Sequence, residues 1–97
     1  MGSVARDLIQ FFPDKEDEAE SERLAKLIWE SFDGGERDTF HALMRHGPVW
    51  DGDIPSKTGR DELLTLGLAV RCCLKSAHGY TALSYLGGTF CELLGLT

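Results

Sequence analysis

The hydrophobic pattern changes its period after Gly67, and this change limits the possible folds more than any other feature of the sequence. Before Gly67, the leucines within 63–66 form the buried side of a short helix, which the glycine ends. From 68 to 75, apolar residues alternate with mostly polar ones, as in a strand with one apolar face. The apolar positions are Leu68, Val70, Cys72 and Leu74. With a turn over 76–79 and a second strand over 80–84, the pattern predicts a two-stranded β-hairpin.

Helices are expected on both sides of this hairpin. Apolar residues at helical spacing predict helices over 1–12, 15–32 and 36–47. Asp14 is the expected N-cap of the second helix, and Gly34-Gly35 separates the second from the third.

Capping residues mark two more helices. Thr58, with Asp61 three residues later, matches the reciprocal capping pattern and predicts a helix that ends at Gly67. Ser84 is the expected N-cap of a last helix, although Gly87-Gly88 weakens its first turn. The apolar residues of that helix are Leu86, Phe90, Leu93 and Leu94.

Length and composition indicate one globular unit. The chain has 97 residues, 42% of them hydrophobic, and no apolar run approaches the roughly 20 residues that cross a membrane. The N-terminus lacks the features of a secretory signal, and the spacing of the three cysteines does not match a disulfide framework. We therefore expect a cytoplasmic protein with no membrane contact.

Two stretches carry a family resemblance. The sequence LLTLGLAV at 63–70 leads from a helix through a glycine into a strand, and LSYLG at 83–87 leads from a strand into a helix. With the order of elements over 36–95, these stretches resemble the winged helix-turn-helix family. The resemblance implies a mainly α fold with a two-stranded β-hairpin, in which a winged-helix-like domain (36–97) follows an acidic helical extension (1–35). The sequence departs from the family over 48–57, which is too short for a complete middle helix and turn.

The resemblance also implies binding to double-stranded DNA, as in a transcriptional regulator. The contacts that it implies, at the start of the presented helix and on the wing, are Ser56, Lys57, Thr58, Arg60, Arg71, Lys75 and His78. Charge argues against this function. The net charge is −6, and carboxylates stand beside the same basic groups, so an approaching phosphate meets a cancelled field. A role in intrachain ion pairs is a simpler explanation of the charges at Lys57 and Arg60 than contact with DNA.

Trp50 suggests a different function, because it lies in a polar turn and not in a helical stripe. It either covers the core from the loop or anchors a protein partner. The candidate partner-binding residues are Trp50, Asp51, Asp53, Leu24 and Ile28. The apolar face of the long acidic helix either packs on its own domain or pairs with a second chain, and we expect a homodimer.

The sequence contains no established pattern for a metal, a cofactor or catalysis. Cys72 and Cys73 are adjacent on the expected strand, so their side chains point to opposite faces and do not share one ion easily. A turn is sufficient to explain Asp51 and Asp53. A phosphate-binding glycine loop and a nucleophile elbow are both missing from the sequence. We expect no metal, no cofactor and no enzymatic activity.

Two functions therefore stay open. One is a small DNA-binding regulator, and the other is an acidic protein-interaction module, an inhibitor or adaptor of host machinery that does not bind DNA. The stretch PVWDGDIPSKTGRDEL at 48–63 also resembles a segment of small uncharacterised phage and prophage proteins. That resemblance implies a genetic setting and no particular activity.

Overall fold

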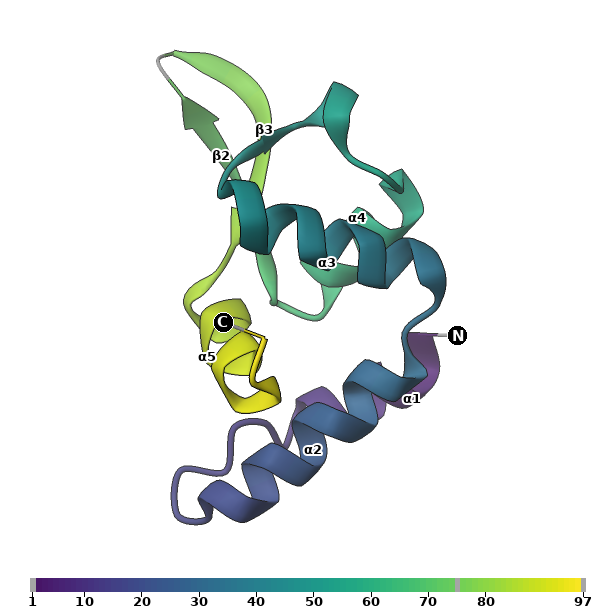
Figure 1. Ribbon diagram of the computed structural model, residues 1–97, viewed down its shortest axis with the longest axis vertical. Coiled ribbons are helices and arrows are strands. Elements are labelled where there is room, and N and C mark those ends of the chain that lie inside the picture. Colours follow the sequence, from purple (N-terminus) through teal and green to yellow (C-terminus); the bar gives the residue numbers. More distant parts are fainter. Residues whose placement is uncertain (1, 75, 97) are drawn as a thin grey trace.

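The computed structural model describes residues 2–74 and 76–96, except for the side chains of residues 2 and 3. The described part is mainly helical and contains a small antiparallel sheet (Figure 1). Its elements are α1 (Gly2–Ile9), α2 (Glu18–Ser31), α3 (Gly34–His46), β1 (Val49–Trp50), the 3-10 helix η1 (Asp51–Asp53), α4 (Lys57–Thr65), β2 (Ala69–Leu74), β3 (Ala77–Leu83) and α5 (Tyr85–Leu94).

The first long helix begins later than the sequence predicted. Asp17, and not Asp14, caps α2 by accepting a hydrogen bond from the amide of Glu20 at 3.1 Å. Asp14 accepts the amide of Glu16, and its backbone exchanges two hydrogen bonds with the Ser21 hydroxyl. Residues 14–17 are therefore a turn that leads into the helix.

Two other helix starts also differ from the prediction. Gly34 and Gly35 begin α3 and do not separate two helices, because Asp33 and Glu36 form a capping box with two hydrogen bonds of 2.8 Å. Ser56, and not Thr58, caps α4 by accepting the amide of Gly59 at 2.9 Å. The predicted N-cap Ser84 of α5 is confirmed, since its hydroxyl accepts the amide of Gly87.

The sheet has three strands and not two. Its order is β1-β3-β2, with both neighbouring pairs antiparallel. No strand was predicted at residues 49 and 50, which pair with Thr81 and Tyr80. The strand β3 begins at Ala77, so the expected turn over 76–79 is wrong in its bounds, and Lys75 lies outside the described residues.

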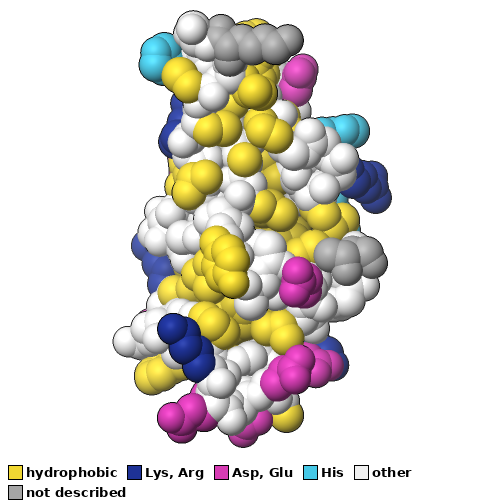
Figure 2. All heavy atoms as spheres, turned by 90° about the vertical axis from the view of Figure 1, so that its left-hand side faces the viewer, with side chains coloured by type: hydrophobic (Ala, Val, Ile, Leu, Met, Phe, Trp, Pro, Cys, Tyr) yellow, Lys and Arg dark blue, Asp and Glu magenta, His cyan; other side chains and the backbone are white. Residues whose placement is uncertain are grey.

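The apolar side of β2 faces away from the core. The predicted strand is confirmed, but its burial does not alternate: Val70 is 45% exposed and Leu74 is 38% exposed, whereas Leu68 and Ala69 are buried. The hairpin projects beyond the helices (Figure 1), so only its base is covered. Figure 2 shows the left-hand side of Figure 1, where hydrophobic side chains extend from the hairpin at the top down over the helices.

One core joins the N-terminal segment to the rest of the chain. Leu24 and Ile28 of α2 are buried in the same hydrophobic cluster as Phe40 of α3 and Phe90 of α5. Arg6 of α1 donates two hydrogen bonds to Glu62 of α4, at 2.7 and 3.2 Å. The apolar face of α2 therefore packs on its own chain, which is one of the two expected arrangements; the other was pairing with a second chain. None of the described helices is long and apolar enough to span a membrane.

Candidate functional site

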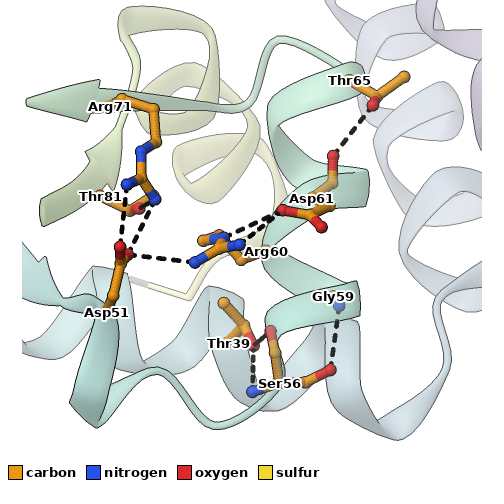
Figure 3. A network of polar contacts seen from close by, with 9 residues as sticks. All are labelled: Thr39, Asp51, Ser56, Gly59, Arg60, Asp61, Thr65, Arg71 and Thr81. Atoms are coloured by element: carbon orange, nitrogen blue, oxygen red, sulfur yellow. Dashed lines mark hydrogen bonds and ion pairs between the residues drawn. The ribbon is translucent and has the colours of Figure 1, made fainter. Parts of the chain in front are cut away.

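Asp51, the first residue of η1, connects three segments that are distant in the sequence (Figure 3). Its carboxylate accepts two hydrogen bonds from Arg71 of β2, at 2.8 and 2.9 Å. It also accepts one from Arg60 of α4 at 3.1 Å, and Arg60 donates further hydrogen bonds to Asp61. Two of the expected DNA-binding cations are thus held by carboxylates of their own chain.

This network makes the protonation of Asp51 matter to stability. The hydrogen bonds from Arg71 lower the pKa of Asp51 below its usual value, so folding favours the carboxylate. A group with a lowered pKa stabilises the fold above its unfolded pKa and loses that contribution as the pH falls through the folded pKa.

We expect Asp51→Asn to lower the free energy of unfolding at neutral pH, because the amide lacks the charge that both guanidinium groups bind. The deficit relative to the native protein should shrink below about pH 4, where an ordinary aspartate becomes protonated. Urea denaturation at neutral and acidic pH measures this deficit in the free energy of unfolding. Asp53→Asn is the control, since Asp53 has no ion-pair partner among the described residues. An equal deficit at both pH values would contradict the expectation.

The other expected DNA-binding residues are spread over three kinds of environment. Ser56 is half-buried, and its backbone exchanges two hydrogen bonds of 3.2 Å with the Thr39 hydroxyl of α3. Lys57 and Thr58 are exposed in the first turn of α4, and His78 is exposed on β3. The expected contact at Lys75 lies outside the described residues.

Trp50 lies on the surface beside a hollow of about 530 Å³. Its side chain is 52% exposed, and it pairs across the sheet with Tyr80. Its indole lies over Gly52, where an added Cβ atom would overlap the ring, so the glycine permits this position. The hollow is lined by Ala42, His46, Pro48, Val49, Trp50, Asp53, Pro55 and Tyr80.

The expected partner-binding residues are only partly brought together. Trp50 and Asp53 line the same hollow, and Asp51 lies between them in the sequence. Leu24 and Ile28 do not join this surface, because both are buried in the core of their own chain. The sequence did not identify Tyr80 as a member of this surface. The pairing of β1 with β3 brings Tyr80 beside Trp50, and a strand of two residues is too short to show a periodic pattern.

A contact between Cys73 and His78 was also missed. The Cys73 Sγ atom lies 2.9 Å from His78 Nδ1 across the hairpin, and both residues are exposed. No signal in the sequence indicated it, because His78 lies within the predicted turn over 76–79. In the part of the chain that the structure describes, no three His, Cys, Asp or Glu side chains are grouped to hold a metal ion.

Comparisons of the chain with protein-family models, with curated proteins and with solved structures found no match.

Proposed function

We propose that the chain is a non-catalytic regulatory protein of winged-helix-like fold that binds a protein partner at the hollow beside Trp50. The observation that carries the proposal is the pairing of Arg60 and Arg71 with Asp51 next to an exposed indole. To bind DNA, these arginines would have to release the Asp51 carboxylate that already holds them and pair with a phosphate instead. Burying the indole requires no such exchange, and tryptophan is enriched among residues that dominate binding energies.

The order of the elements supports the winged-helix-like part of the proposal. A helix (α3), a short connection with η1, a second helix (α4), the hairpin of β2 and β3, and a closing helix (α5) follow one another over residues 34–94. The connection contains one 3-10 turn where the family would have a middle helix. Fold analogy alone does not assign DNA binding, so the function must be argued from the surface.

The chemistry of the hollow favours a basic segment of the partner. Trp50 and Tyr80 provide aromatic faces, which attract a Lys or Arg side chain, and Asp53 provides a carboxylate. No Lys or Arg of the described chain lines the hollow, and the net charge of the protein is −6. Pro48 and Pro55 add apolar walls that would bury the stem of a long cationic side chain.

DNA binding is the second candidate, and one observation favours it. Lys57 and Thr58 are exposed at the start of α4, where backbone amides attract anions. Such binding would weaken steeply with added salt, because it depends on the release of counterions from the phosphates.

The two candidates are distinguished by measuring the binding of three titrants by isothermal titration calorimetry, with the indole N–H resonance of Trp50 followed in the labelled native protein. One titrant is a peptide with arginines and prolines, a second has glutamate in place of each arginine, and a third is mixed-sequence duplex DNA. We expect the basic peptide alone to shift the resonance. Trp50→Ala should weaken its binding by about 30-fold, which corresponds to the roughly 2 kcal/mol of a dominant contact. Asp53→Asn should weaken it by about fivefold, as expected for an exposed ion pair.

Tyr85→Ala is the matched control. Tyr85 is 93% exposed on α5 and does not line the hollow, so its removal should leave the binding unchanged. Binding of duplex DNA that Lys57→Ala abolishes and Trp50→Ala preserves would favour the second candidate. A basic peptide that binds the native protein and Trp50→Ala equally well would refute the first.

A further inference from the structure

A bulge near the tip of the hairpin sets two side chains against each other. Cys72 pairs with Tyr80 and Leu74 pairs with Ala77, so the single residue Cys73 lies opposite both His78 and Gly79. Gly79 has a φ of +90°, a conformation that glycine adopts without strain. Bulges of this kind redirect a side chain from the regular alternation of the strand. The result is the 2.9 Å contact between Cys73 Sγ and His78 Nδ1.

The contact opens into a hollow of about 350 Å³ on the surface of the hairpin. The hollow is lined by Arg71, Cys72, Cys73, His78 and Gly79. It therefore combines a thiol, an imidazole and a guanidinium group, and within the described residues no carboxylate lines it. A hollow of this size and exposure admits a small reagent to the Cys73 sulfur.

We propose that Cys73 is a reactive thiol, with His78 as its proton acceptor, and that it is a site of modification by low-molecular-weight disulfides. With the imidazole proton on Nε2, the Nδ1 atom accepts the thiol proton and leaves a thiolate. The thiolate attacks one sulfur of the disulfide, a bond forms between that sulfur and Cys73 Sγ, and the original S–S bond breaks. The Cys73 sulfur is oxidised, and the departing thiolate is the reduced product, which takes up the proton that His78 releases.

The other two thiols lack this arrangement. Cys91 is buried beside Met44, with 3.2 Å between the two sulfur atoms, and burial raises the pKa of its thiol. Cys72 lines the hollow, but no imidazole of the described chain lies within hydrogen-bonding distance of it. A thiolate and not a thiol is the nucleophile, so the modification is selective for Cys73.

The proposal is tested by reacting the reduced 97-residue chain with oxidised glutathione at neutral pH and locating the adduct by peptide mass spectrometry. We expect one adduct, at Cys73, and a rate that Cys72→Ser leaves unchanged. His78→Gln should slow the reaction by about tenfold. This factor is expected because an ordinary thiol is only a few per cent thiolate at neutral pH, so transfer of its proton to His78 raises the thiolate fraction. The lower nucleophilicity of such a thiolate offsets part of the gain in rate.

Denaturation separates activation by His78 from other effects of the substitution. In concentrated urea, the native protein and His78→Gln should react at the same rate, because the contact is lost in both. Far-ultraviolet circular dichroism verifies that the variants are folded before urea is added. Adduct formation mainly at Cys72, or equal rates for native protein and His78→Gln in the folded state, would overturn the proposal.

Discussion

Gly87→Ala is expected to destabilise the protein by about 3 kcal/mol, whereas Gly88→Ala at the next position should stabilise it by up to about 1 kcal/mol. A Cβ atom at position 87 would overlap the carbonyl oxygen of Leu68 and would lie 3.2 Å from its carbon. That oxygen also accepts the amide of Ser84, the N-cap of α5, at 3.0 Å. The helix and the chain before β2 would therefore have to separate.

Gly88 is a control in the same turn of the same helix. A Cβ atom there would meet nothing within 4 Å, so only the higher helix propensity of alanine is expected to act. Urea denaturation followed by circular dichroism compares the two variants with the native chain. If both substitutions changed the free energy of unfolding equally, the close approach of α5 to Leu68 would be contradicted.

Phe90→Ala is expected to destabilise the protein by about 3–5 kcal/mol, as for other buried phenylalanines. Its ring lies 5.6 Å from that of Phe12, 6.1 Å from that of Phe32 and 5.5 Å from that of Phe40. Two of these rings belong to the N-terminal segment and one to α3, so the cavity would weaken the contact of α5 with both parts of the chain.

The same variant tests whether residues 1–35 unfold with the rest of the chain. Trp29 of α2 packs against Phe40 at 5.5 Å, so its fluorescence reports on the junction of the two parts. We expect fluorescence and circular dichroism to give one coincident transition, shifted to lower urea in Phe90→Ala. Phe11→Ala is the control, because Phe11 is exposed and its loss should cost less than about 0.5 kcal/mol. A separate transition of the N-terminal helices would contradict a shared core.

The proposed function and the proposed thiol site rest on two hollows that share no lining residue, so each proposal can fail without the other. Trp50→Ala should weaken the binding of a basic peptide by about 30-fold without changing the reaction of Cys73. His78→Gln should slow that reaction without changing the binding, because His78 does not line the hollow beside Trp50. Measuring both properties in both variants therefore assigns each result to one proposal.

The sequence by itself determined the features that depend on neighbours along the chain. The change of period after Gly67, the N-cap at Ser84 and the shortened connection before α4 are local properties, because caps, turns and side-chain alternation act over a few residues. The helices were predicted for the same reason, although the starts of α2, α3 and α4 were displaced. Ser56 caps α4 where its backbone is held by Thr39 of α3, a partner 17 residues away.

Only the tertiary structure decided which surfaces are free and which charges are paired. The alternation in β2 could not reveal that its apolar side faces outward, because that depends on which faces the helices cover. Asp51 meets Arg71 across 20 positions of the sequence, and Cys73 meets His78 through a bulge that two strands create together. These contacts depend on strand register and helix packing, which bring together side chains that no short stretch of sequence relates to each other.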